Sequence, residues 1–306
     1  MRKKIIKWSA IILTSFAAIA ATYYFAVAKL PQQTMTQAEI VDKYQYFNTF
    51  SNFKVLSEIG NTRSFSFRAF DGELIHGQIQ LPEQKRDSYP VLVGLHAMGR
   101  SYPRWFKDEL KGRATVTKVD KLTKMALSKG YAVVAIDARF HGKRKIEGKS
   151  LRRIWNNLHY FGDKFDYQQM IVNSVIDNRT LLDWIATQPE LDANRITLAG
   201  YSMGGQVALL MGAVDNRVKQ IISVVPPFID NKVAIVSPLN LVSKINAARV
   251  LVIYGEHDDV ASPEQNQLIF DNITSTHKQI VSFEEDHILP IEYVEVVGNW
   301  LKTEEL

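Results

Sequence analysis

From residue 90 onward, short apolar runs alternate with longer runs of helical character. The short runs are rich in Val, Ile, Leu and Ala, which is typical of strands buried on both faces of a parallel sheet. This alternation favours right-handed strand–helix–strand crossovers. The predicted strands span residues 91–95, 131–137, 195–200, 218–225, 250–254 and 279–283. The predicted helices span residues 116–129, 167–187, 205–213, 263–273 and 291–303.

An antiparallel start to the sheet is predicted upstream of this region. The dipeptide Asp71-Gly72 is a hairpin signal between two runs of alternating apolar residues. The three β-rich runs span residues 53–59, 63–70 and 73–81.

An insertion interrupts the alternation at residues 142–166, which are rich in Lys, Arg and aromatic residues. Because it follows the carboxyl end of a strand, we expect it beside the mouth of a site. It could be a lid that selects acidic or membrane-bound substrates, or a solvated basic loop with aromatic anchors. The sequence favours the loop.

The first residues form a separate segment, in which residues 1–7 are basic and residues 8–28 form an uncharged apolar run. The run is long enough to cross a bilayer as a helix. The three aromatic residues at 23–25 are typical of a belt at the membrane interface. This pattern predicts an uncleaved signal anchor at residues 1–30.

The anchor implies a membrane protein whose body lies outside the cytoplasm. The predicted organisation is a tether at residues 31–52 and a catalytic domain at residues 53–306. Ala26-Val27-Ala28 also resembles a signal-peptidase site, and cleavage after Ala28 would give a secreted or periplasmic form.

The charge of the chain is concentrated at its beginning. The net charge is +5, and five of the 37 basic residues lie within the first thirty positions, which hold no acidic residue. The remaining 32 basic residues balance 32 acidic residues, which argues against a nucleic-acid-binding protein. The chain has no cysteine, which excludes a thiol nucleophile, a disulfide and a lipoprotein anchor.

The most informative motif is Gly200-Tyr201-Ser202-Met203-Gly204, which fits the pattern G-x-S-x-G. A β-prone run precedes it and an apolar helical run follows it, as in a nucleophile elbow. The glycines are needed because a side chain at either position would collide with the sharp turn. We therefore predict Ser202 as a nucleophile, the alternative being a chance glycine turn with a surface serine.

The base and the acid of a triad follow in chain order. His287 lies after the last predicted strand, where it can accept the proton of Ser202. Asp258 and Asp259 both follow the preceding strand. We favour Asp258 as the acid and keep Asp259 as the alternative, since an aspartate here can also cap the next helix.

The oxyanion hole is expected to combine two backbone amides, those of Met203 and of a residue in the loop after the first parallel strand. By position, the second amide belongs to Met98. His96 is interpreted as a brace for this loop. Such a site requires neither a metal nor an organic cofactor.

Several stretches resemble the α/β-hydrolase superfamily, and within it the bacterial branch that is similar to dienelactone hydrolases and acetyl xylan esterases. They are residues 130–142, residues 192–196 leading into the elbow, residues 255–258 and Asp286-His287. The resemblance implies an α/β fold, with a mostly parallel eight-stranded sheet, helices on both faces and no large cap. It also implies the roles given above for Ser202, Asp258, His287, Met98 and Met203.

The resemblance further implies that Asp137, Arg139 and His141 are structural. Two positions depart from the family. Ala97 replaces the usual glycine of the His-Gly loop, and Ser202 replaces the cysteine of true dienelactone hydrolases, which argues against their substrate.

The predicted function is hydrolysis of a carboxylic ester of a small molecule through an acyl-enzyme intermediate. A peptidase, thioesterase or acyltransferase on the same fold is the first alternative. A non-catalytic envelope protein that uses the fold for binding is the second. Specificity is expected in the loops at residues 100–115 and 142–166.

Overall fold

The computed structural model describes residues 2–47, 53–247 and 249–301, and its centre is a mixed β-sheet. Within the described residues this sheet has nine strands, in the order β1-β2-β3-β7-β4-β8-β9-β10-β11. The expected number of eight strands is therefore wrong by one. The sequence contains nine β-prone runs, and all nine form strands of this sheet. The strands are β1 Lys54–Ile59, β2 Thr62–Arg68, β3 Leu74–Gln80, β4 Tyr89–Leu95, β7 Ala132–Ile136, β8 Leu191–Tyr201, β9 Val218–Val224, β10 Arg249–Gly255 and β11 His277–Phe283.

The sheet is mostly parallel, as predicted. Strands β1, β2 and β3 pair antiparallel with one another, and β3 pairs antiparallel with β7. All pairs from β7 to β11 are parallel. The carboxyl ends of β4, β8, β10 and β11 therefore meet at one edge, where the loops that follow them can form a site.

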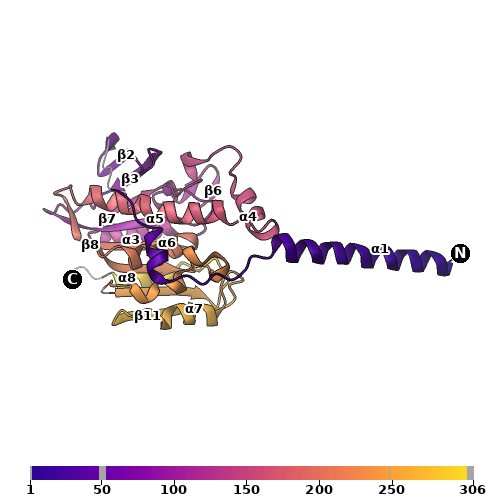
Figure 1. The fold of residues 1–306 in the computed structure, drawn as a ribbon. Helices are drawn as coiled ribbons and strands as arrows, with labels where there is room; N and C mark the ends of the chain where they lie inside the picture. The colour runs from indigo at the N-terminus through magenta and orange to yellow at the C-terminus, as the bar shows by residue number, and fades with distance from the viewer. Residues whose placement is uncertain (1, 48–52, 248, 302–306) are drawn as a thin grey trace.

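Helices cover both faces of the sheet (Figure 1). Val91 and Val93 of β4 pack in the core beneath α5, α6 and α7, whereas Leu92 packs in the core beneath α3 and α8. Successive side chains of a strand point to opposite faces, so this alternation explains the continuous apolar runs of the sequence. The helices are α3 Val119–Ser128, α5 Phe165–Ile185, α6 Met203–Val214, α7 Pro263–Asp271 and α8 Glu292–Trp300.

The insertion contains a helix where we expected a loop. Helix α4, Leu151–Tyr160, begins after Ser150, whose Oγ accepts a hydrogen bond from the Arg153 amide. Ile154 is buried, and Leu151 and Leu158 pack against the same core. This apolar spacing gives α4 one face to bury, which stabilises a helix despite its basic outer residues.

A large cap is absent from the described residues between β9 and β10. This connection holds three short 3-10 turns, at Asn231–Val236, Pro238–Asn240 and Val242–Lys244. Other short elements are the 3-10 turns Tyr102–Trp105 and Gly142–Arg144 and the small hairpin of β5 Glu109–Leu110 and β6 Arg113–Ala114.

The N-terminal helix α1, Arg2–Tyr23, projects away from the domain (Figure 1). A π-helical turn, Tyr24–Ala28, connects it to the body. In the ranges that the structure describes, no helix combines the length and the apolar character needed to cross a membrane.

The predicted tether packs on the domain. Its short helix α2, Gln37–Asp42, buries Ile40, and Tyr44 is buried just beyond it. The Tyr44 hydroxyl donates to the carbonyl of Ile235. The end of the tether (48–52) and the end of the last predicted helix and of the domain (302–306) lie outside the described residues.

Candidate active site

Ser202 lies at the turn between β8 and α6, in a backbone conformation with φ +55° and ψ −119°. This region is sparsely populated by residues other than glycine and is typical of functional turns. The flanking glycines permit the turn. A Cβ at Gly200 would lie 2.0 Å from the carbonyl oxygen of Gly204, and a Cβ at Gly204 would lie 2.0 Å from that of Leu95.

Three of the predicted residues meet in one hydrogen-bonded chain. The Oγ of Ser202 lies 2.8 Å from Nε2 of His287, and Nδ1 of His287 lies 2.7 Å from Oδ2 of Asp258. A carboxylate only accepts hydrogen bonds, so the neutral imidazole carries its proton on Nδ1. Nε2 is then free to accept the serine proton.

Of the two aspartates that the sequence left open, only Asp258 contacts the histidine. Its carboxylate is almost fully buried, and its second oxygen accepts a hydrogen bond from the Val260 amide at 2.8 Å. Asp259 is exposed and lines the adjoining cavity.

Backbone contacts hold the loops of the acid and the base together. The amide of His257 donates to the carbonyl of Glu285 at 3.0 Å. Gly255 makes this approach possible, because a Cβ there would lie 2.4 Å from the carbonyl oxygens of both Glu285 and Asp286. The relative position of Asp258 and His287 is thus fixed by the main chain.

Two amides near Ser202 have no partner of their own. Among the described residues, the N–H groups of Met98 and Met203 donate to no protein acceptor. Met203 is the first residue of α6, where helix geometry leaves the N–H unpaired. Both methionines line the same cavity as Ser202. These amides are available to an anion that forms beside the serine.

The loop that carries Met98 is a tight turn. The Arg100 amide donates to the carbonyl of Ala97 at 3.1 Å, and Gly99 has φ +75°. The positive φ falls on Gly99, so the turn does not depend on a glycine at position 97. The departure of Ala97 from the family pattern therefore leaves the turn intact.

The cavity beside Ser202, called here the serine cavity, has a volume of about 790 Å³. Its walls are mostly apolar and aromatic. They come from the loop after β4, from α4 and α5, from residues 227–233 and from the N-terminal segment, whose Tyr24, Ala28, Lys29 and Leu30 line it. Helix α4 contributes Trp155, Leu158 and His159.

The histidines and charged residues assigned structural roles make buried contacts. His96 accepts a hydrogen bond on Nε2 from the Ala138 amide, and its Nδ1 donates to the Ala97 carbonyl. Burial lowers the pKa of His96 to about 4 and that of His141 to about 3, so both rings are neutral near pH 7.

Arg139 belongs to a buried ion-pair cluster formed by Asp71, Glu73, Arg139, Arg144 and Asp177. Both arginines contact the fully buried Asp177 at 2.8 Å, and both also contact Glu73. The cluster joins the β2–β3 hairpin to α5.

Two features of the site leave no signal in the local sequence. Tyr201 donates its hydroxyl to the carbonyl of His287 at 2.9 Å and accepts from the Leu289 amide at 3.0 Å, which braces the histidine loop. Burial raises the pKa of Tyr201 to about 12, so the hydroxyl keeps its proton. The second feature is the N-terminal wall of the serine cavity, which involves residues more than 170 positions before Ser202.

Residues 108–287, more than half of the chain, match the Dienelactone hydrolase family. The chain is also similar to YtaP, a candidate hydrolase of Bacillus subtilis (strain 168), with 30% identity over 138 residues. This alignment covers 45% of the present chain and 44% of YtaP, so it spans less than half of that protein.

Two solved structures show the same fold at low sequence identity. Acetyl xylan esterase from Paenibacillus sp. R4 superposes with a TM-score of 0.66 at 17% identity, over 92% of this chain and 98% of that enzyme. Acetyl xylan esterase 1 from Thermoanaerobacterium sp. JW/SL YS485 gives a TM-score of 0.67 at 18% identity, over 89% and 94%. These similarities establish the α/β-hydrolase fold.

Proposed function

The chain belongs to the dienelactone hydrolase family, and from this premise we propose that it is a serine hydrolase that cleaves a carboxylic ester. The observation that carries the proposal is the hydrogen-bonded chain from Ser202 through His287 to Asp258. This is the arrangement of a nucleophile, a general base and an orienting carboxylate. It opens on a mostly apolar cavity, which suits the acyl or alcohol part of an ester.

The reaction has two halves. In the first, Oγ of Ser202 attacks the acyl carbon while its proton passes to Nε2 of His287, which then protonates the leaving alcohol. In the second, His287 takes a proton from water, and the resulting hydroxide attacks the acyl-enzyme. Release of the carboxylic acid returns the proton to Ser202. Asp258 holds the imidazole in the required tautomer and stabilises its charged form.

The amides of Met98 and Met203 serve as the oxyanion hole. Each tetrahedral intermediate carries a negative oxygen, and donors with no other partner stabilise it without having to break an existing bond. Two fold relatives are acetyl xylan esterases, so short acetyl esters, acetylated xylan included, are the first substrates to test.

The test combines labelling and turnover. The full chain is treated with a fluorophosphonate, the adduct is mapped by peptide mass spectrometry, and hydrolysis of acetyl and longer esters is measured beside thioesters and aminoacyl amides. We expect an adduct on Ser202 and turnover of esters. Ser202→Ala should lose both, while Ser128→Ala, which alters an exposed serine on α3, should keep both.

Turnover that survives Ser202→Ala would refute the proposed nucleophile. Labelling without ester turnover, combined with turnover of the amides or thioesters, would assign the site to a different acyl transfer. A folded protein that neither labels nor turns over would favour a binding role for the fold.

We also propose that α1 attaches the protein to the cell membrane, with the catalytic domain outside the cytoplasm. The apolar side chains of Ile12, Leu13, Phe16 and Ile19 are 66–74% exposed on this projecting helix, and the preceding residues are basic. Cell fractionation with protease treatment of intact spheroplasts tests this. Protection of the domain from the protease would contradict it, and sequencing the mature N-terminus would reveal cleavage after Ala28.

A further inference from the structure

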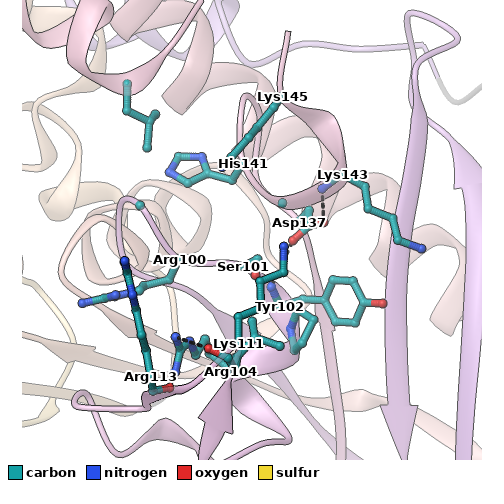
Figure 2. A pocket seen from close by; sticks show the side chains of 15 residues that line it. Arg100, Ser101, Tyr102, Arg104, Lys111, Arg113, Asp137, His141, Lys143 and Lys145 are labelled. Carbon is teal, nitrogen blue, oxygen red and sulfur yellow. Dashed lines mark hydrogen bonds between the residues drawn. The ribbon is translucent and has the colours of Figure 1, made fainter.

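A second cavity, of about 600 Å³, is lined by residues that directly follow Met98 in the chain (Figure 2). Gly99 and Arg100 of this loop line it, and so does Leu151 at the start of α4. We call it the basic pocket, because six cationic side chains line it together with a single carboxylate, that of Asp137. The six are Arg100, Arg104, Lys111, Arg113, Lys143 and Lys145.

None of these six side chains forms an ion pair with a described carboxylate, since the ion pairs of the described residues all lie elsewhere. Five of them also make no side-chain hydrogen bond within the described residues, the exception being Arg104. Within the described residues, their positive charges therefore have no directly paired carboxylate.

Arg104 is affected by the positive charges of neighbouring residues. Its guanidinium is buried, and among the described residues it donates only to neutral acceptors, namely the carbonyls of Leu110 and Arg113 and the hydroxyl of Thr115. Burial lowers the pKa of Arg104, and the charges of Arg100 and Arg113 lower it further. Glu109, which lies with Arg113 on the β5–β6 hairpin, raises the pKa of Arg104 by less than these two arginines lower it.

Asp137 supplies one negative charge against the six positive charges of the lining. Its two carboxylate oxygens accept the backbone amides of Tyr102 and Lys143, each at 3.0 Å, so they fix the inner wall (Figure 2). The close approach requires Gly142, where a Cβ would lie 2.0 Å from the carboxylate. The carboxylate thus positions the loop that carries Lys143 and Lys145.

Lys111 lies in a backbone conformation that is uncommon for lysine. Lys111 and Gly112 form the two-residue tip of the β5–β6 hairpin, with φ +55° and +71°. A lysine in the left-handed region is uncommon and costs free energy relative to glycine. Three segments far apart in sequence, at 100–104, 111–113 and 143–145, bring like charges into one cavity, which is unfavourable unless an anion binds there.

We propose that the basic pocket binds a small molecule through its phosphate group. Guanidinium groups bind phosphate oxygens in pairs, and ammonium groups add point charges that suit a dianion. The cations line one open cavity of small-molecule size, whereas a nucleic-acid site would spread them along a face. The phosphate belongs either to a soluble phosphate ester or to the head group of a phospholipid.

The experiment measures binding to the full chain at fixed ionic strength, with a non-ionic detergent present only in the calorimetric arm. Sodium glycerol 3-phosphate is titrated calorimetrically, with glycerol as the uncharged control. In a parallel arm, cosedimentation compares vesicles of phosphatidylglycerol with vesicles of phosphatidylcholine. We expect saturable binding in at least one arm, and the arm that responds identifies the source of the phosphate.

The decisive comparison uses two double variants of equal charge. Arg100→Gln with Arg113→Gln should weaken binding about tenfold or more, because two charge-assisted contacts are lost. Lys54→Gln with Lys124→Gln, on β1 and α3, removes two exposed cations outside the pocket and should leave binding unchanged. If the arginine pair fails to fold by circular dichroism, Lys143→Gln with Lys145→Gln replaces it, since both lysines are exposed.

Equal weakening by the two double variants, or the absence of saturable binding in both arms, would overturn the proposal. The result is independent of the proposed esterase, because Ser202→Ala removes the nucleophile from the other cavity and should bind the phosphate ligand normally.

Discussion

Adjacent residues of one loop line the serine cavity (Met98) and the basic pocket (Gly99), and the polar groups of the two cavities differ in how they are paired. In the serine cavity, Ser202, His287 and Asp258 are joined by hydrogen bonds, so their geometry is set before any ligand arrives. In the basic pocket, the cations have neither carboxylate partners nor, apart from Arg104, side-chain hydrogen bonds within the described residues.

A third region clarifies the difference. Arg139 and Arg144 lie close in sequence to Lys143 and Lys145, yet both arginines are locked to Asp177. A buried cation with such a partner is part of the structure, because removing either partner leaves a charge without compensation. A cation near the surface with no partner is available to a ligand. The same short stretch of chain thus supplies both kinds.

The largest expected effect is a loss of ester hydrolysis that leaves ligand binding in the basic pocket unchanged. Ser202→Ala should lower kcat/KM for ester hydrolysis by about 10,000-fold or more, because the base and the acid contribute little without the nucleophile. Binding of glycerol 3-phosphate or of anionic vesicles should not change. Steady-state kinetics and the binding assay on the same preparation provide the check. A parallel loss of phosphate binding would show that the two cavities are a single site.

The next effect concerns the hydrogen bond between Asp258 and His287. Asp258→Asn should lower kcat by roughly 1,000- to 10,000-fold, because an amide no longer holds the histidine tautomer. Asp259→Asn, one residue further along, should change kcat by only a few fold, since Asp259 does not contact His287. Equal kinetic losses in the two variants would contradict the assignment.

The third prediction contrasts paired with unpaired cations. Asp177→Asn should lower the free energy of unfolding by roughly 3–5 kcal/mol, because Arg139 and Arg144 then keep a buried charge without its main partner. Lys143→Gln should change it by less than about 0.5 kcal/mol, because Lys143 is exposed and its side chain pairs with no described carboxylate. Urea denaturation of both variants measures the difference. Similar values would remove the distinction between the cluster and the pocket.

The fourth prediction is a pH dependence of stability that arises from His96 and His141. Burial lowers the pKa of His96 from 6.5 to about 4 and that of His141 from 6.5 to about 3. Between pH 6.5 and these lower values, the unfolded state therefore binds more protons than the folded state. Their contribution to stability is complete above pH 6.5 and is lost as the pH falls toward 4 and below.

Denaturant titrations at several pH values test this, with His141→Phe as the informative variant. The plot of the free energy of unfolding against pH should become less steep by at most about 1.4 kcal/mol per pH unit, which corresponds to about one proton. His277→Gln, at an exposed position of β11, is the matched control and should keep the original slope. An unchanged slope in His141→Phe would mean that this ring is already protonated in the native state.

The smallest expected effect concerns the N-terminal wall of the serine cavity. Leu30→Ala should raise KM for an ester by about threefold and leave kcat unchanged, because it removes apolar contact area and leaves the triad untouched. Leu13→Ala on the projecting part of α1 is the control, since Leu13 does not line the cavity. A fall in kcat with constant KM would indicate that the segment acts on the chemistry instead.

Much of this protein is determined by local sequence. The alternation of buried strands and helices, the two glycines around Ser202 and the order of serine, acid and histidine follow from backbone sterics and from burial on both faces of a sheet. Each depends on residues near one another in the chain. The helix in the insertion differs from the expected loop, although Ser150 and the apolar spacing of Ile154 and Leu158 are local signals for a helix.

The tertiary structure decided what depends on distant segments meeting. It selected Asp258 over Asp259, because the geometry of the loop pairing around Gly255 places only one of two adjacent carboxylates beside His287. It brought Leu30 to the wall of the serine cavity and collected cations from three loops into the basic pocket. After residue 30 the numbers of basic and acidic residues are equal, so composition does not predict a basic pocket. Composition counts the charged residues, whereas the fold determines which of them form ion pairs.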